Sequence, residues 1–523
     1  MAVANRALGP AAGMALGTSL SRATGFLRTV ALATALGVTA TSDAYNTANT
    51  APMMLFTLVA GGALSASVVP LLLRADGRRG EVASVLLGVT LVGGVVLSAG
   101  LALAAPLLFR ALAAGAGTRT DHEAYVSLGT SWLRMFAPQV ALYALSVLAV
   151  AVMTARRRLA LGATAPVLTN ILTSVVAVAY VYLVGSRPDG PALVPASGRL
   201  LLGWGTTAAV ASMVALQLWG AWRCEPGWRP TLQLRHPAVR ELVRAGGWVL
   251  VYVATNQVGL AVVISTASGT AGGVTAYQWG FMVMQLPYAI VAVSLLSAAL
   301  PSIATRDGNT GGAALAASTR STITWLVPAA VGLGLAAGPV AVVLVGANEA
   351  TLVTAAISGF AVSLLPFSIF QLLTRTSYAL GDARAPAMVN VGVNVVNIAC
   401  ALATAAWAAT PVSRVAGLAL SHAASYVVGC VALAPTVLRH LGLTWGTVVV
   451  GHRRLLVAAL PLGAATVALS DPLDSLQSRW GAAVAVAGIC AVVVILPALW
   501  SRAFGGDVRS GQLAGTVQSA GRP

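Results

Sequence analysis

The sequence predicts an all-α polytopic membrane protein. Of its 523 residues, 58% are hydrophobic and only 9% are charged, whereas a soluble domain carries about 25% charged residues. Apolar stretches recur along nearly the whole chain, and each is long enough to cross the roughly 30 Å hydrocarbon core of a bilayer as a helix. Most of the protein surface is therefore expected to face lipid.

Counting these stretches predicts about fourteen transmembrane helices. Each has at least the roughly 17 residues that a spanning helix needs. In chain order the expected helices are 11–37, 43–73, 83–108, 125–153, 160–184, 200–222, 239–266, 274–303, 318–345, 351–378, 385–409, 413–436, 454–470 and 480–500.

The distribution of arginine supports this count. All 31 basic residues are arginine, and the net charge is +17. With a cytoplasmic N-terminus, 22 arginines fall on the cytoplasmic side and three within spans. The six on the outer side are Arg110, Arg119, Arg187, Arg199, Arg414 and Arg479. Because cytoplasmic loops are rich in basic residues, we expect both termini in the cytoplasm. Membrane topology then explains the positive charge, and no loop is long enough to form a nucleic-acid-binding domain.

An internal repeat divides the predicted helices into two sets. The segment "ALGATAPVLTNI" at 160–171 recurs as "ALGDARAPAMVNV" at 379–391, and both the Pro166/Pro386 and the Asn170/Asn390 pairs are 220 residues apart. This offset covers six spans, an even number, so the two copies have the same orientation in the membrane. A parallel repeat of this kind is typical of alternating-access transporters.

The repeat predicts four parts of the chain. Two six-helix lobes are followed by two further helices and a cytoplasmic tail. The expected bounds are 1–222 for the N-lobe, 223–440 for the C-lobe, 441–503 for the last two helices and 504–523 for the tail.

Two arginines in the first predicted helix are the main functional candidates. Arg22 and Arg28 are about 9 Å apart along the helix axis, so both cannot lie at a membrane surface. An arginine at a span centre costs roughly 2.5–3.5 kcal/mol, so both are expected to face a bundle interior or a wet cavity. Of the 14 acidic residues, only Asp43 lies in or beside a span. Since a guanidinium matches phosphate oxygens bidentately, we expect Arg22 and Arg28 to bind an anionic substrate. Asp43 is expected to complete the substrate site by orienting one guanidinium or closing the outer gate. A structural pairing of the arginines with carbonyls or with Asp43 is the alternative.

Other polar residues within spans are weaker candidates. Asn390, Asn394 and Asn397 share one face of a predicted helix, because they are spaced by four and three residues. They predict either an ion site or hydrogen bonds between helices. The remaining candidates for the cavity are Arg134, Asn49, Asn256, Gln257, Gln285 and His422.

The sequence carries no constellation for catalysis or metal binding. Its only cluster of acidic and histidine residues, at 120–125, lies on an outer loop. The four cysteines are scattered and have neither the spacing of a disulfide framework nor that of a zinc site. We therefore expect a transporter without a cofactor or metal, and not an enzyme.

Several motifs, in order along the chain, resemble the MurJ (MviN) lipid II flippases of the multidrug/oligosaccharidyl-lipid/polysaccharide exporter superfamily. They are "SRATGFLR", "ATSDAYNTANTAP", "GGALSASVVPLL", "WLRMFAP", "APVLTNI", "QLPYAIVAVSLLSAALPSIA" and "RTSYALGDARAPAMVN". The resemblance implies two lobes around a substrate cavity, with a groove for the lipid tail along the last two helices. It implies transfer of lipid II, an undecaprenyl-diphosphate-linked glycopeptide, to the outer leaflet of a bacterial cytoplasmic membrane. Membrane lipids and the cell-wall synthesis machinery are the further partners that it suggests.

The family's functional positions are only partly kept. Its first-helix arginines fall on Arg22 and Arg28, and the acidic residue that opens its second helix falls on Asp43. Other charged positions of the family are uncharged in this chain, namely Phe56, Thr57, Gly61, Phe281, Met282 and Gln285. This pattern indicates a divergent member.

Three other functions stay open at this point. The chain could export another polyprenyl-diphosphate-linked oligosaccharide or an anionic solute. A membrane glycosyltransferase would need paired carboxylates on a sizeable outer loop, and only Asp121 and Glu123 approximate such a pair. A structural scaffold would tolerate changes of the arginines within the spans.

Overall fold

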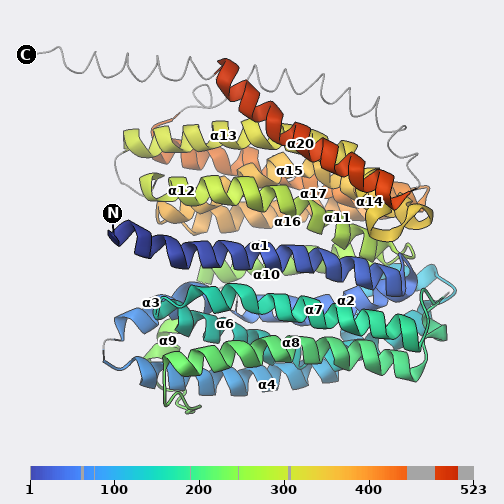
Figure 1. The fold of residues 1–523 in the computed structure, drawn as a ribbon, viewed down its shortest axis with the longest axis horizontal. Helices are drawn as coiled ribbons and strands as arrows, with labels where there is room; N and C mark the ends of the chain where they lie inside the picture. The colour runs from blue at the N-terminus through green and yellow to red at the C-terminus, as the bar shows by residue number, and fades with distance from the viewer. Residues whose placement is uncertain are drawn as a thin grey trace, which may run out of the picture. The chain divides into compact units, whose positions relative to one another are not determined.

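The computed structural model describes residues 2–60, 64–75, 77–188, 190–244, 247–303, 308–443 and 478–504. Every regular element in these ranges is a helix (Figure 1). Contacts group the chain into two compact units, unit 1 (Met1–Gln278 and Ala383–Leu418) and unit 2 (Trp279–Asp382 and Ala419–Pro523). The all-α membrane architecture predicted from the sequence is confirmed.

Unit 1 contains the helices of the first half of the chain together with one later helix. Its elements are α1 (Ala2–Leu36), α2 (Ala40–Ala60), α3 (Leu64–Arg74), α4 (Arg79–Leu112), η1 (Ala114–Thr118), α5 (His122–Phe136), α6 (Gln139–Ala155), α7 (Leu159–Leu183), η2 (Pro191–Leu193), α8 (Ala196–Cys224), α9 (Pro237–Arg244), α10 (Gly247–Ala267) and α16 (Arg384–Trp407).

Unit 2 contains most of the remaining helices. They are η3 (Tyr288–Ala292), α12 (Val293–Ile303), α13 (Gly308–Leu335), α14 (Ala337–Val345), η4 (Ala347–Glu349), α15 (Ala350–Ala379) and α20 (Arg479–Phe504). Two helices, α11 (Gly273–Pro287) and α17 (Pro411–His440), begin in unit 1 and end in unit 2. The lobe boundaries derived from the repeat stay a prediction.

Small residues let the helices of unit 1 pack closely. The helix α1 packs along α7, which in turn packs against α8, and α4 packs against α6 (Figure 1). A Cβ atom on Gly17 would lie 2.8 Å from Thr164 of α7, and one on Gly94 of α4 would lie 2.8 Å from the backbone of Ala141. Larger side chains at these two positions would push the helices apart, which explains why glycine occupies them.

The described helices agree with most of the predicted spans. Nine are long and apolar enough to cross a membrane, or ten if α13 and α14, which meet at a bend of 57°, form one span. The break between α5 and α6 falls at Ala137–Pro138, inside one predicted span. The predicted helix at 454–470 lies outside the described residues. The total of fourteen spans therefore stays a prediction.

Candidate functional site

Arg28 lies half-buried on α1, where it faces groups on two other helices. It interacts electrostatically with the hydroxyl groups of Tyr45 on α2 and Tyr143 on α6. Its Nε atom is buried and has no hydrogen-bond partner in the described part of the chain. A buried donor without an acceptor costs about 1–3 kcal/mol. The Arg28 guanidinium can therefore accept an anion as a ligand without breaking a contact of its Nε.

The tyrosine on α2 is held firmly beside Arg28. The Tyr45 ring stands edge-on to Trp132 at 5.6 Å and to Phe136 at 5.5 Å between centroids. Its hydroxyl is 2.7 Å from Oγ1 of Thr206 on α8. Both the ring and the hydroxyl are thus fixed, which gives this wall of the Arg28 environment a defined shape.

A second chain of hydrogen bonds fixes the tyrosine on α6. The Tyr143 hydroxyl donates to Oε1 of Gln139 at 3.0 Å, and the Gln139 amide donates to Thr207 at 3.1 Å. Thr207 then donates to the carbonyl of Met135 at 2.8 Å. The two hydroxyl groups that interact electrostatically with Arg28, those of Tyr45 and Tyr143, are neutral and do not cancel its positive charge.

Arg22 has a different environment from Arg28. Its side chain is exposed, and six residues of helix place it about 120° around α1 from Arg28. Among the described residues it makes no hydrogen bond or ion pair. The structure brings Arg28, but not Arg22, next to the polar groups of α2 and α6.

Asp43 is fully buried in the first turn of α2 and ties this helix to the start of α11. Its Oδ1 accepts hydrogen bonds from the Thr275 backbone N–H at 2.8 Å and from the Thr275 hydroxyl at 2.7 Å. The Thr275 hydroxyl also accepts from Asn46 at 3.0 Å and lies 2.9 Å from the Ser42 hydroxyl. Four groups of α2 and α11 are thus joined at one point. Asp43 makes no ion pair with either arginine of α1 in the described residues.

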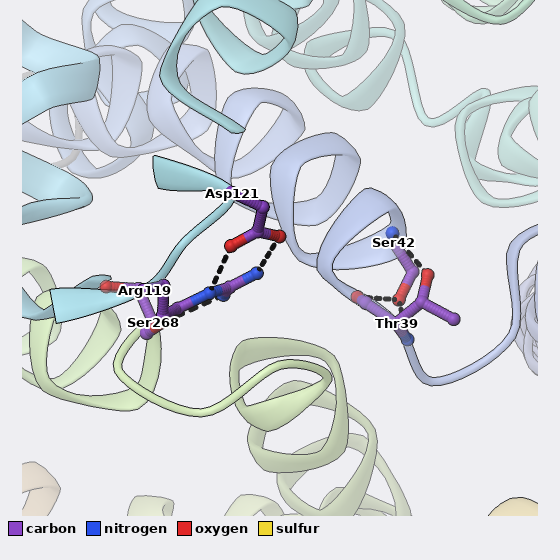
Figure 2. Close-up of polar contacts among 5 residues, drawn as sticks. All are labelled: Thr39, Ser42, Arg119, Asp121 and Ser268. Atoms are coloured by element: carbon purple, nitrogen blue, oxygen red, sulfur yellow. Dashed lines mark hydrogen bonds and ion pairs between the residues drawn. The ribbon is translucent and has the colours of Figure 1, made fainter. Parts of the chain in front are cut away.

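Arg119 forms a second connection at the same end of unit 1, shown in Figure 2. It donates to the carboxylate of Asp121 through Nε at 2.8 Å and through Nη2 at 2.5 Å. Its Nη1 donates to the carbonyl of Ser268, after the end of α10, at 3.0 Å. Arg119 also interacts electrostatically with Asp43. The Asp43–Thr275 and Arg119–Ser268 contacts therefore join the α10–α11 turn to α2 and to the loop before α5.

The turn before α2 is stabilised locally. The backbone N–H of Thr39 donates to the Ser42 hydroxyl at 3.0 Å, and that of Ser42 donates to the Thr39 hydroxyl at 3.3 Å (Figure 2). This reciprocal capping satisfies N–H groups that a helix start leaves unpaired. It fixes the position from which Ser42 and Asp43 reach Thr275.

The asparagines of α16 bind α10. Asn390 is fully buried and donates to the Asn256 side-chain oxygen at 3.0 Å, and Asn394 donates to the same oxygen at 2.9 Å. Asn397 is also buried on α16. For Asn390 and Asn394, these contacts favour hydrogen bonds between helices over an ion site.

His422 lies in unit 2 and is buried on α17. Its Nδ1 is 2.5 Å from the hydroxyl of Ser363 on α15. The rings around it belong to Phe281, Phe360, Phe367 and Tyr426. Phe281 belongs to this aromatic cluster and also contacts the rings of Phe360 and Phe367.

The other predicted candidates are less enclosed. Asn49 on α2, Gln257 on α10 and Gln285 on α11 are half-buried. Arg134 is exposed and lines a pocket formed by α4, α5 and α8. Within the described residues there is no group of three or more His, Cys, Asp or Glu side chains that could hold a metal ion.

Sequence reasoning missed the neutral partners of the charged residues. Tyr45 is two residues from Asp43 and one from Asn46, so a search three or four residues along α2 from these two side chains does not mark it. No local pattern pointed to Thr275, which is 232 residues from Asp43.

Comparison with known proteins identifies one family over most of the chain. The family described as lipid II flippase MurJ matches residues 32–497. The lipid II flippase MurJ of Burkholderia cenocepacia is 27% identical over 402 residues, which cover 72% of this chain and 74% of that protein. The probable lipid II flippase MurJ of Rhizobium tropici is 26% identical over 496 residues, covering 91% and 89%.

Solved structures show the same fold. A lipid II flippase MurJ in an inward closed conformation has a TM-score of 0.72 at 16% identity, with 94% of this chain and 98% of that chain covered. An inward-facing multidrug-resistance MATE transporter has a TM-score of 0.63 at 14% identity, with 81% and 95% covered. The fold is thus one that alternating-access transporters share.

Proposed function

The chain belongs to the MurJ family of lipid II flippases, and we propose that it binds the diphosphate of lipid II at Arg28, with Arg22 as a second phosphate ligand. It is a multi-pass membrane transporter and not an enzyme. The observation that carries the proposed site is the buried, unpartnered Nε of Arg28. A diphosphate offers acceptor oxygens in the geometry that a guanidinium binds best.

The surroundings of Arg28 suit the rest of the head group. Tyr143 on α6 is half-buried, and its hydroxyl, which donates to Gln139, can still accept a hydrogen bond from a sugar hydroxyl. Tyr45 and Gln139 are fully buried and hydrogen-bonded to other groups of unit 1, so they support this wall without contacting the head group. Because these groups are neutral, they leave the attraction between Arg28 and phosphate at full strength.

We also propose a role for the contacts around Asp43 in alternating access. While the substrate enters from the cytoplasm, the Asp43–Thr275 and Arg119–Ser268 contacts keep the outer end of unit 1 closed. Release requires these contacts to separate. An inside-negative membrane potential favours outward movement of negative charge by roughly 2.3 kcal/mol per charge per 100 mV.

The orientation with both termini in the cytoplasm is part of this proposal. It follows from the arginine-rich segments at Arg74–Arg79, Arg156–Arg158 and Arg223–Arg244, which lie at one end of the helices that they connect. In this orientation the arginines on the outer side are Arg110, Arg119, Arg187, Arg199, Arg414 and Arg479. The cell-wall synthesis machinery is a proposed partner that would receive the flipped lipid.

The side chain at position 56 favours a second class of substrate, other polyprenyl-diphosphate-linked glycans. Phe56 replaces a basic residue of the related flippases, and it packs against Tyr143 with 5.9 Å between ring centroids. Phe281 in unit 2 is likewise uncharged. A paralogue that moves another polyprenyl-diphosphate-linked glycan would share Arg28 and differ at these positions.

Replacement of a resident flippase tests the function directly. The chain is expressed in a bacterium whose own lipid II flippase can be depleted, and growth and surface-exposed lipid II are measured. Rescue of both supports lipid II as the substrate. In the contrary outcome, the protein inserts correctly, fails to rescue growth and transports another lipid-linked glycan in vesicles. That glycan, and not lipid II, would then be assigned as the substrate.

A further inference from the structure

A pocket on unit 1 is lined by none of the residues assigned to the diphosphate site. It has a volume of about 520 Å³ and is formed by α4, α5 and α8. Its polar lining consists of Arg110, Glu123, Ser127, Thr130, Ser131 and Arg134. Trp204 of α8 forms one wall. The pocket therefore combines two cations, one carboxylate, three hydroxyls and an indole.

The spacing of these residues shows that α5 presents one continuous polar face to the pocket. Glu123, Ser127, Thr130 and Arg134 are separated by four, three and four residues, which places them on one side of the helix. Along the axis they cover about 16 Å. This length is greater than the diameter of a single ion and matches an extended polar ligand.

The polar groups of the pocket lack partners of their own. In the described part of the chain, neither Arg110 nor Arg134 makes an ion pair or a hydrogen bond, although Glu123 lines the same pocket. Thr130 is 91% buried, and its hydroxyl has no hydrogen-bond partner. A buried hydroxyl without a partner is costly. The pocket thus has a net positive charge and contains hydrogen-bonding groups that are not paired within the described residues.

Exposed apolar side chains lie on α4 and α8 within two helical turns of the residues that line the pocket. Leu107 and Leu103 precede Arg110 by three and seven residues on α4 and are 76% and 83% exposed. On α8, Leu200 is 51% and Trp204 is 50% exposed. In helices that cross the membrane, such exposed leucines contact acyl chains. A ligand of this pocket therefore meets hydrocarbon directly beside its polar groups.

The pocket lies at the level of lipid head groups. The helix α4 has 34 residues, and its length of about 51 Å exceeds the roughly 30 Å hydrocarbon core. Arg110 is in its last turn, at the end opposite the arginine-rich loop. Tryptophan is enriched at this depth. Under the orientation proposed above, on which this step depends, the pocket opens to the outer leaflet.

We propose that this pocket binds an anionic phospholipid of the outer leaflet, with phosphatidylglycerol as its simplest form. Arg110 and Arg134 bind the phosphate, and the hydroxyls of Ser127, Thr130 and Ser131 bind the glycerol head group. The acyl chains lie along Leu103, Leu107 and Trp204. The excess of arginine over carboxylate selects against head groups that carry an ammonium.

Quenching of Trp204 tests this assignment in lipid nanodiscs. Phosphatidylglycerol or phosphatidylethanolamine with bromine near the head of the acyl chains is added at equal mole fractions. The Trp204 signal is the difference between the wild-type protein and Trp204→Phe. Both lipids offer the same phosphate, but the ammonium of phosphatidylethanolamine is repelled by Arg110 and Arg134. Half-maximal quenching by phosphatidylglycerol is therefore expected at a mole fraction on the order of tenfold lower.

Variants and a competitor separate the possible outcomes. The double variant Arg110→Ala/Arg134→Ala is expected to abolish the preference, and Arg199→Ala, at the outer end of α8 outside the pocket, to keep it. Thermal unfolding and native mass spectrometry of co-purified lipid check folding and binding independently. Equal quenching by both lipids, or a preference that survives the double variant, would overturn the proposal. Loss of the preference in millimolar inorganic phosphate would assign the pocket to free phosphate instead.

Discussion

Asn170 and Asn390 make equivalent hydrogen bonds to two different helices. The Asn170 amide on α7 donates to the Ser21 carbonyl at 2.9 Å and to the Thr24 hydroxyl at 3.2 Å on α1. The Asn390 amide on α16 donates to the Tyr252 carbonyl at 3.0 Å and to the Thr255 hydroxyl at 3.0 Å on α10. In each case the carbonyl and the threonine are three residues apart.

The threonines in these contacts are equivalent as well. Thr24 donates to the Leu20 carbonyl at 2.8 Å, and Thr255 donates to the Val251 carbonyl at 3.0 Å. Each threonine is thus oriented by its own helix to accept from the asparagine. The sequence repeat that pairs Asn170 with Asn390 therefore reflects a repeated helix–helix contact.

We predict that both asparagines stabilise the fold, Asn390 more than Asn170. Hydrogen bonds between membrane helices contribute about 0.6–1.7 kcal/mol each. Asn390→Ala removes a further contact, to Asn256, so its thermal unfolding temperature is expected to fall further than that of Asn170→Ala. The control is Asn49→Ala, a half-buried residue that makes no hydrogen bond in the described residues. A larger loss for Asn49→Ala than for Asn390→Ala would contradict the prediction.

The sequence was sufficient to predict the helices and this repeat because both depend on local patterns. Apolar length determines a span, and the fixed offset between Asn170 and Asn390 marks equivalent positions. The break at Pro138 and the partners of Asp43 were not predicted. Thr275 meets Asp43 only through the packing of helices far apart in the chain, and neither residue carries a local signal for the other.

The environments of Arg22 and Arg28 also could not be predicted from the sequence, although both residues lie on one helix. Their presence in an apolar segment correctly drew attention to α1. Their environments differ because six residues place them about 120° apart around the axis. That Arg28 is half-buried and Arg22 exposed depends on which side of α1 meets its neighbours, chiefly α7, and the sequence of α1 alone does not determine this.

The proposed topology predicts on which side of the membrane four loop positions lie: Gly190 and Ala347 outside, and Gly77 and Gly308 inside. Single cysteines at Gly190 and Ala347 are expected to react with an impermeant maleimide in intact cells. Cysteines at Gly77 and Gly308 are expected to react only after permeabilisation. The background must first lose Cys224, Cys400, Cys430 and Cys490. Reversed labelling at either pair of sites would contradict the proposed orientation.

The contacts around Asp43 are predicted to control the outer end of unit 1. Thr275→Val removes the hydroxyl donor and keeps the shape of the side chain. Because a hydrogen bond to a charged group contributes about 1.5–3 kcal/mol, the closed population is expected to decrease by roughly tenfold or more. Labelling of a cysteine at Asn46, which lies beside Thr275, measures the opening, with the Asn46→Cys protein as reference.

A second variant at this end separates its two connections. Arg119→Ala removes the donor to Ser268 and the partner of Asp121, and it is expected to increase the same labelling. If both contacts close the same gate, labelling in the double variant Arg119→Ala/Thr275→Val should increase by more than the sum of the increases in the two single variants. Unchanged labelling in all three proteins would show that these contacts only hold the fold together.

Arg28 is predicted to be essential for translocation but not for folding. Arg28→Ala removes the buried guanidinium, and with it charge-assisted hydrogen bonds to phosphate of about 1.5–3 kcal/mol each, so a loss of lipid II binding by at least tenfold is expected. The protein should still insert, because an arginine in a span is costly. Arg28→Lys should restore binding in part, since an ammonium keeps the charge but lacks the bidentate fork.

Arg22→Ala is the informative comparison, because Arg22 is exposed on the other side of α1. If Arg22 is a second phosphate ligand, its loss reduces translocation and adds to the effect of Arg28→Lys. Expression, thermal stability, lipid II binding and lipid II translocation are measured for each variant and for Arg199→Ala as a control. Normal translocation by the double variant Arg22→Ala/Arg28→Ala would show that both charges are structural. The diphosphate would then have to bind elsewhere along the pathway.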